Sequence, residues 1–363
     1  MEVIIMSKFI KIKPMDTQFF RDGTPFKAGT SNWIQSMLIP NPSVFYGAIF
    51  SAYLMQNSKQ GLAERILSNN LKKEEKRNYE ETIARYFSIK NIYLYDEREN
   101  EIYIKAPLDM HIDDDNYAYI DSLENGLLKP RAKDYESVEN KLISMNAYYQ
   151  YILKKEEIKL YDLSNFILQD YKVGIELNSK RVSEDKQLYK MDINEFKDTN
   201  ITYLIEYETD NGEFELRDYG FLKLGGESKV AKYKVEDDFS NYKLRRLENK
   251  SDEKIDKFKM VFKQAVFSDF IERIKDLEEL KIIKLITDRA KRVGGYDYKK
   301  KRPKVMRKVY QAGTVLYIKS KEKISIEKLT KKIEESLQEL TYEYESFKGF
   351  NSFDLIEDKG EQR

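Results

Sequence analysis

The order of strand-like and helix-like segments is the feature of this sequence that most restricts its possible folds. The stretch over 236–256 is almost entirely charged or polar, and it is the best candidate for a linker between two parts of the chain. On each side of it, hydrophobic spacing indicates a strand, a helix, a pair of strands, a second helix and a further strand. We therefore expect two domains of similar construction.

The expected elements follow from the local periodicity of apolar residues. In the first part, strands are predicted at 8–20, 89–95, 101–106, 171–177, 187–191 and 201–208, and helical segments at 43–56, 61–87 and 135–153. In the second part, strands are predicted at 258–267 and 314–319, with helical segments ending at 280 and running over 326–340. This order is typical of the ferredoxin-like fold, which RNA-recognition domains share. We predict an α+β protein of two ferredoxin-like (RRM-like) domains with helical insertions, over 1–240 and 241–345, and a tail at 346–363.

Composition excludes several classes of protein. The 363 residues exceed the usual size of one core, and 41% apolar with 35% charged residues allow buried cores beneath a charged surface. The absence of cysteine excludes disulfide scaffolds, thiolate metal sites and cysteine nucleophiles, and fits a reducing cytoplasm. The start MEVIIM lacks the pattern of a signal peptide, and the apolar stretch at 33–55 is interrupted by prolines. We expect a cytoplasmic protein without a membrane contact, translated from Met1 or Met6.

One segment is strongly basic in a chain whose formal net charge is only +1. Residues 289–308 include ten Lys or Arg and a single acid, Asp297, so a polyanion would be attracted here and repelled by much of the remaining surface. Gly294 and Gly295 allow the backbone to approach a phosphate, and Tyr296 can stack on an unpaired base. The alternative is a solvated hairpin whose lysines keep a sheet edge soluble. Both interpretations stay open on this segment alone.

Two further features are compatible with RNA binding. The region at 171–189 predicts a projecting hairpin with basic residues near its tip, namely Lys180, Arg181 and Lys186. An ordinary exposed hairpin is the alternative. Ser43 follows Pro42 and is well placed as the N-cap of the buried helix, where free N–H groups can also bind a phosphate. Gly47 in that helix indicates close helix packing.

Patterns for catalysis or metal binding are weak. Asp16 and Asp22 could form a carboxylate pair, but the adjacent Arg21 and a glycine turn favour a turn or an ion pair. The single histidine, His111, lies in the acidic run DMHIDDD, which lacks the glycine and the ligand spacing of a calcium loop. A solvated acidic loop is the favoured interpretation. We predict no catalytic residue, no metal site and no cofactor.

Five segments carry a more specific signal, in a fixed order. They are PMDTQFFRDGTPF at 14–26, PSVFYGA at 42–48, VGIEL at 173–177 with LY at 188–189, LGGE at 224–227, and GGYD at 294–297 followed by PK at 303–304 and AGT at 312–314. Together they resemble the third subunit of the type III-B CRISPR effector (Cmr) complex, a protein of the RAMP superfamily. The resemblance covers most of the chain.

The resemblance implies two ferredoxin-like RAMP domains that bind the 5′ handle of the CRISPR RNA (crRNA). It implies as partners the crRNA, the large cyclase/nuclease subunit and the first backbone subunit, with target RNA contacted indirectly through a thumb-like hairpin. The predicted function is a non-catalytic scaffold in antiviral defence. Two alternatives remain, a metal-independent endoribonuclease that processes precursor RNA and a free-standing RNA-binding module. The single histidine weakens the ribonuclease, since related RAMP nucleases generally use histidine to move protons.

The candidate RNA-binding residues come from these segments and from the basic runs. In the first part they are Arg21, Lys27, Ser43, Lys180, Arg181, Lys186, Gly225, Gly226, Ser228 and Lys229. In the second part they are Arg292, Gly294, Gly295, Tyr296, Lys299, Lys300, Lys301, Arg302, Lys304 and Arg307. Gly226 and Gly295 are expected to let backbone N–H groups reach phosphates of the handle.

Overall fold

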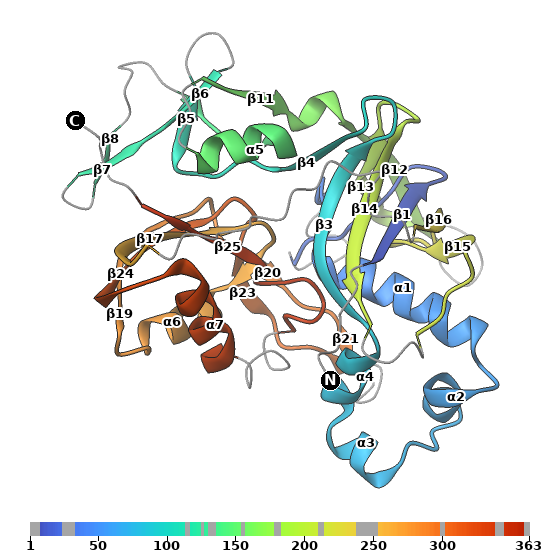
Figure 1. Ribbon diagram of the computed structural model, residues 1–363. Helices are drawn as coiled ribbons and strands as arrows, with labels where there is room; N and C mark the ends of the chain where they lie inside the picture. The colour runs from blue at the N-terminus through green and yellow to red at the C-terminus, as the bar shows by residue number, and fades with distance from the viewer. Residues whose placement is uncertain are drawn as a thin grey trace.

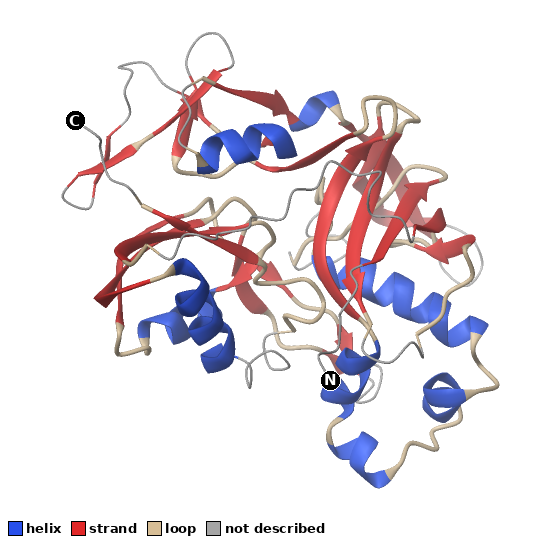
Figure 2. Cartoon of the chain, in the orientation of Figure 1, coloured by secondary structure: helices blue, strands red, loops and turns tan. Residues whose placement is uncertain are grey.

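The protein is a mixed α/β structure built on antiparallel sheets (Figure 1). The computed structural model describes residues 8–23, 33–112, 117–124, 127–129, 136–153, 157–177, 183–209, 214–236, 253–297, 302–337 and 345–358. The first part of the chain (8–236) forms the largest sheet, and the second part (253–358) forms a smaller sheet with helices on one side (Figure 2).

The largest sheet has 11 strands, and each hydrogen-bonded neighbour runs antiparallel. In spatial order they are β15 (Tyr219–Lys223), β16 (Val230–Glu236), β1 (Lys8–Pro14), β14 (Ile201–Glu208), β3 (Ser88–Asp96), β4 (Glu101–Lys105), β10 (Lys141–Ser144), β11 (Ile158–Asp162), β6 (Tyr117–Ile120), β5 (Met110–Ile112) and β9 (Glu136–Ser137). β1 lies between β14 and β16, so the N-terminal strand is an inner strand of this sheet.

Helix α1 (Pro42–Gln56) covers one face of this sheet. Pro42 occupies its first turn, where the fixed φ of proline suits a helix and no N–H is needed. Phe45 and Ile49 are fully buried in the same cluster as Ile10 and Ile12 of β1. The expected buried helix is therefore confirmed. Gly47, however, is exposed, and a Cβ there would meet no atom within 4 Å, so the prediction of close packing at Gly47 is wrong.

The second part packs α6 (Ser268–Lys275) and α7 (Ile326–Leu337) against a sheet of order β19-β24-β17-β25. These strands are β19 (Leu280–Ile286), β24 (Val315–Ile324), β17 (Ile255–Phe262) and β25 (Phe353–Glu357). A smaller sheet contains β18 (Val266–Phe267), β23 (Arg307–Tyr310) and β20 (Lys291–Val293), and β21 (Tyr296–Asp297) pairs with β22 (Arg302–Pro303). The segment expected as a tail thus supplies β25, which pairs with β17.

Three other groups of elements complete the first part. β12 (Ile167–Leu177), β13 (Ser183–Phe196) and β2 (Trp33–Ile34) form a separate sheet, and β7 (Ser122–Glu124) pairs with β8 (Leu127–Lys129). The remaining helices are α2 (Gly61–Leu67), α3 (Lys73–Arg77), α4 (Tyr79–Tyr86), α5 (Met145–Ile152) and the short 3-10 helix at Leu163–Asn165. No described helix is long and apolar enough to cross a membrane.

One buried cluster joins the two parts. Phe9, Tyr93 and Leu204 of the largest sheet lie in the same cluster as Val315 and Tyr317 of β24. The face of the sheet opposite α1 is therefore covered by the second part around β3 and β14. This contact brings segments of the two parts together near the start of β1.

Several predicted boundaries were wrong for local reasons. The first strand ends at Pro14 rather than at 20, because proline cannot donate to the ladder. Of the helix predicted at 135–153, only α5 is helical, because residues 141–144 form a strand between β4 and β11. Ser144 then caps α5, since its hydroxyl accepts a hydrogen bond from the N–H of Ala147 at 3.2 Å. The predicted linker at 236–256 lies mostly outside the described residues.

Candidate nucleic-acid interface

The segment after β1 leaves the large sheet and is held by hydrogen bonds to β13 and to the chain before α1. Gln18 exchanges two backbone bonds with Asn194 of β13, at 2.7 and 2.8 Å. The N–H of Phe20 donates to the hydroxyl of Ser36 at 3.0 Å, and its carbonyl accepts from the N–H of Met37 at 2.8 Å. These bonds fix the segment at 16–23 between the β12–β13 hairpin and the chain that leads into α1.

The glycine turn at 224–229 packs directly on this segment. Gly225 has φ +79°, and a Cβ there would lie 2.5 Å from the carbonyl oxygen of Phe19, so the turn requires glycine. The N–H of Gly226 donates to the same carbonyl at 2.8 Å. Because that amide already has a partner, a contact between the Gly226 N–H and a phosphate would require this bond to break.

An ion pair fastens the same two segments together. The ammonium of Lys229 donates to Asp16 Oδ2 at 2.8 Å and to Thr17 Oγ1 at 3.1 Å. This hydrogen bond from Lys229 lowers the pKa of the Asp16 carboxyl below its usual value. Asp16 therefore belongs to an ion pair, as its sequence context favours. The other member, Lys229, directly precedes β16 and lies more than 200 residues later in the chain.

The basic segment of the second part reaches the same place. A Cβ on Gly23 would lie 2.3 Å from the carbonyl oxygen of Arg292 and 2.5 Å from the Cε atom of Met306, so the two segments are in contact. The N–H of Lys304 donates to the carbonyl of Gly295 at 2.9 Å and closes the hairpin. These contacts bring together three segments, namely 16–23, 224–229 and the described residues of 291–307. We call this contact region the three-segment junction.

The predicted cations at this junction divide into two groups. Lys229 is paired with Asp16, Lys304 forms an ion pair with Glu345, and Arg307 lies 3.3 Å from Asp269 and over the ring of Phe267. By contrast, the exposed side chains of Arg21, Arg292 and Arg302 form no ion pair within the described ranges. A guanidinium group can bind phosphate in a bidentate manner.

Some predicted residues lie beyond what the structure describes. Lys27, Lys180, Arg181, Lys299, Lys300 and Lys301 are outside the described residues, and the side chains of Lys186 and Tyr296 are not described. Ser228 is exposed in the turn, with φ +55°, and Gly294 and Gly295 form the connection between β20 and β21. RNA contacts by these residues remain predictions.

The predicted role of Ser43 as an N-cap is wrong. The helix already begins at Pro42, so Asn41 occupies the cap position and Ser43 is the second helical residue. The Asn41 side chain makes no capping hydrogen bond, while its carbonyl accepts from the N–H of Val44 at 3.0 Å. Proline at the first helical position displaced the expected boundary by one residue.

The sheet of β12, β13 and β2 carries an exposed aromatic face that sequence reasoning missed. Lys190 of β13 lies 4.3 Å from the centre of the Trp33 ring and 3.6 Å from that of Tyr171. Trp33 is 53% exposed and Tyr171 52% exposed, and the indole N–H of Trp33 donates to Asp192 at 2.7 Å. The exposed Val173 and Ile175 continue this face. The alternation of apolar residues along β12 was a usable signal.

The acidic run around His111 is not a solvated loop where it is described, and that interpretation is wrong. Asp109 is fully buried and accepts hydrogen bonds from Tyr151 at 2.9 Å, Tyr317 at 2.8 Å and Lys259 at 2.7 Å. Burial next to this carboxylate raises the pKa of both tyrosines. His111 is also buried and pairs with Asp121. The described residues contain no group of three potential metal ligands, and this cluster joins α5 to the second part.

Lys105 at the end of β4 is a second residue that the sequence did not indicate. Its pKa is lowered to about 8, chiefly by burial and also by the nearby Lys291, while Asp288 and Glu139 act in the opposite direction. A lysine with this pKa can act as a base near neutral pH.

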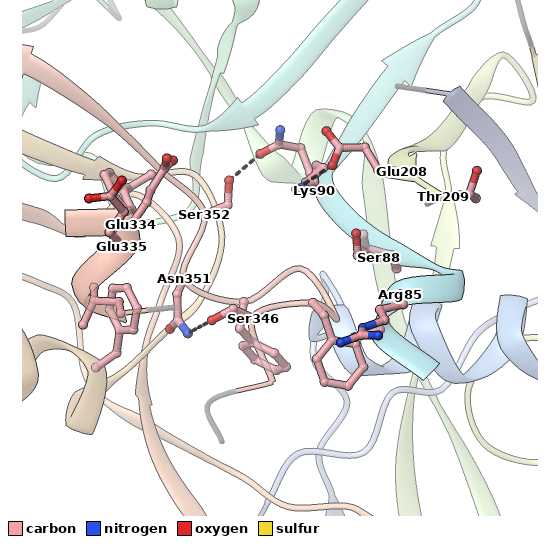
Figure 3. Close-up of a pocket in the computed structure, with 18 of the residues that line it drawn as sticks. Arg85, Ser88, Lys90, Glu208, Thr209, Glu334, Glu335, Ser346, Asn351 and Ser352 are labelled. Atoms are coloured by element: carbon pink, nitrogen blue, oxygen red, sulfur yellow. Dashed lines mark hydrogen bonds and ion pairs between the residues drawn. The ribbon is translucent and has the colours of Figure 1, made fainter. Parts of the chain in front are cut away.

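A cavity of about 730 Å³ lies between the two parts, away from the predicted RNA residues. Figure 3 shows Glu334 and Glu335 of α7 on one side, with the ion pair between Lys90 and Glu208 on the other, where the charged atoms are 2.7 Å apart. Both signs of charge line this cavity. It therefore does not favour a polyanion.

Comparison with known proteins agrees with the architecture. The family described as CRISPR-associated protein (Cas_Cmr3) matches residues 10–352. No curated protein matches the chain.

Three solved structures contain similar chains. One belongs to type III-B Cmr-beta bound to cognate target RNA and AMPPnP, with 16% identity over 94% of this chain and 93% of that one, and a TM-score of 0.54. Another belongs to type III-B Cmr-beta bound to cognate target RNA, with 16% identity, coverages of 94% and 95%, and a TM-score of 0.49. The third is in a Csm3-Csm4 subcomplex of the type III-A CRISPR-Cas interference complex, with 14% identity, coverages of 88% and 94%, and a TM-score of 0.42. At these identities, the first likeness describes the fold alone.

Proposed function

Because the chain belongs to the CRISPR-associated Cas_Cmr3 family, we propose that it is a non-catalytic, RNA-binding subunit of a type III-B CRISPR effector complex. In this proposal it caps the complex at the 5′ handle of the crRNA and acts in antiviral defence in the cytoplasm. The family match over 10–352 supports the assignment to an effector complex.

The three-segment junction is the observation that carries the RNA-binding proposal. It joins three of the segments that carry the resemblance, and it presents Arg21, Arg292 and Arg302 without acidic partners among the described residues. Guanidinium groups that are not neutralised within the protein release counterions on binding RNA and so favour the phosphate backbone. The handle of the crRNA would bind along this junction.

We propose the domains and the remaining partners from the family resemblance. We propose that residues 1–240 and 241–345 are two ferredoxin-like RAMP domains, with 346–363 as a C-terminal segment. The large cyclase/nuclease subunit and the first backbone subunit would be the protein neighbours. The β12–β13 hairpin would be the thumb that contacts the guide and its target, which the exposed Tyr171 of β12 and the adjacent Trp33 of β2 support.

The test of the handle proposal compares two RNAs with the purified full chain. One carries the repeat-derived 5′ handle, and the other has the same length and composition with the handle sequence scrambled. Fluorescence polarisation at several salt concentrations should show tighter binding of the handle RNA. Equal affinity for both RNAs would reject handle recognition, and failure to co-purify with effector subunits from the native host would favour the free-standing module.

A metal-independent endoribonuclease remains the second candidate because Lys105 has a pKa of about 8 beside the basic segment. Incubation of the chain with repeat RNA, with and without a chelator, separates the two functions. We expect intact RNA in both reactions. Cleavage at a single position that is lost in Lys105→Met would establish the ribonuclease instead.

A further inference from the structure

The outer edge of the large sheet has an open face that the junction does not include. Tyr219 is 77% exposed and Phe221 is 64% exposed on β15, the edge strand (Figure 1). The register pairs Tyr219 with Lys234 and Phe221 with Lys232 on β16. Paired residues of antiparallel strands point to the same face, so aromatic and cationic side chains are neighbours here.

The same face continues onto β1. Lys232 is paired with Lys13 and Lys234 with Lys11, so one side of three adjacent strands displays two aromatic rings and a row of lysines. The opposite side of these strands carries Ile10 and Tyr233, which are buried in the core cluster that contains α1 residues. The open face is therefore separate from the hydrophobic core.

Free positive charge is concentrated at one end of this face. Lys11 and Lys234 form ion pairs with Glu236 at 3.0 and 2.9 Å, and Lys13 lies 4.0 Å from Glu97. Lys223 and Lys232 are exposed beside Phe221 and form no ion pair within the described part of the chain. The end with free lysines is the end nearest the glycine turn, which begins directly after β15.

We propose that this face, formed by Tyr219, Phe221, Lys223 and Lys232, is a stacking platform for single-stranded RNA that continues from the junction. The inference rests on the proposed function, because it extends the path of the same bound RNA. Side chains two residues apart on a strand are separated by about 7 Å, a spacing that suits two successive bases. Exposed rings supply base stacking, and the lysines next to them supply phosphate contacts. The charge favours RNA over an apolar protein segment, which would gain nothing from Lys223 and Lys232.

The test uses the full chain and two substitutions at one position. Phe221→Trp keeps a planar ring, whereas Phe221→Leu keeps an apolar side chain without one. With handle RNA extended by single-stranded nucleotides, Phe221→Leu should bind about 5-fold or more weakly, and Phe221→Trp should bind as the unsubstituted chain does. RNA carrying 5-iodouridine should crosslink on irradiation to a peptide that contains Tyr219 or Phe221. The crosslink is measured on the unsubstituted protein, so it decides the matter even if a variant folds poorly.

The outcomes separate this inference from the function on which it rests. If the unsubstituted chain binds no RNA, the proposed function fails and the platform fails with it. If that chain binds handle RNA, but Phe221→Leu binds equally well and no crosslink forms at 219–221, only the platform is overturned. If Phe221→Leu instead weakens co-assembly with the large subunit while RNA affinity is unchanged, the face is a protein interface and the platform is overturned.

Discussion

The ammonium of Lys229 lies 2.8 Å from the carboxylate of Asp16 and joins the glycine turn to the segment after β1. The Asp16 side chain is 64% exposed, whereas that of Lys229 is only 17% exposed. The pair therefore holds the two segments together at the solvent-exposed side of the junction. It also reduces the charge that Lys229 can offer to RNA, although Lys229 belongs to the predicted binding residues.

Removing the acid of this pair should strengthen RNA binding. In Asp16→Asn the Lys229 ammonium is no longer neutralised, so we expect a higher affinity and a log–log salt slope steeper by about 0.7, the value for one contact on a single strand. The free energy of unfolding should change by less than about 1 kcal/mol, since the pair lies at the surface. Salt-dependent polarisation and denaturant titration measure the two effects. An unchanged affinity would show that Lys229 does not contact RNA.

Two arginines of the junction should account for a measurable part of the salt dependence. The double variant Arg292→Ala, Arg302→Ala should bind handle RNA more weakly, and its slope should decrease by about 1.4. Lys323→Ala with Lys328→Ala changes the net charge equally on exposed positions outside the junction and is the matched control. Equal slopes in both double variants would place the RNA elsewhere.

A methyl group at Gly23 should disturb the contact between the first segment and the basic segment. Gly23→Ala places a Cβ 2.3 Å from the carbonyl oxygen of Arg292, so we expect a loss of about 1 to 3 kcal/mol in the free energy of unfolding. Gly47→Ala is the control, because it adds a methyl group in open space on α1 and should stabilise the chain by about 0.5 to 1 kcal/mol. Urea unfolding of both variants checks these opposite signs, and a neutral Gly23→Ala would contradict the packing at the junction.

The buried carboxylate of Asp109 should be essential for stability. Asp109→Asn leaves the ammonium of Lys259 buried without its counter-charge, and we expect a loss of about 3 to 5 kcal/mol. The double variant Asp109→Asn, Lys259→Met removes that charge and should recover part of the loss. Thermal and denaturant unfolding measure both changes. If the losses of Asp109→Asn and of the single variant Lys259→Met simply add in the double variant, the pair is not coupled.

Lys105 should make stability depend on alkaline pH. Its folded-state pKa of about 8 lies below the unfolded value of 10.5, so between these values the unfolded chain binds a proton that the folded chain lacks. The free energy of unfolding of the unsubstituted protein therefore increases as pH rises from 8 to 10.5. Below pH 8 Lys105 is protonated in both states, and the full penalty for burying its charge applies. Lys105→Met should be more stable by about 1 to 3 kcal/mol at pH 7, and this advantage should decrease through the same window. Lys328→Met, at an exposed position, should show neither effect.

Local periodicity predicted several of the longer elements correctly. The helix at α1, the β3–β4 hairpin and α7 were found because each has a regular apolar pattern of sufficient length. Errors occurred where one residue overrode the pattern, as Pro14 ended the first strand and Pro42 advanced the start of α1. The acidic run at 109–115 was misread because burial of Asp109 depends on Lys259 and Tyr317, which lie more than 100 residues away.

The sequence by itself determined the two-part order of elements, the family resemblance and the segments that carry it, because these are properties of consecutive residues. Only the tertiary structure decided that 16–23, 224–229 and the basic segment meet, and which cations remain without acidic partners. Lys229 is neutralised by Asp16, whereas Arg292 has no such partner among the described residues. That difference arises from distances between atoms far apart in the chain, and the free energy of an ion pair depends on such distances and on burial rather than on sequence separation.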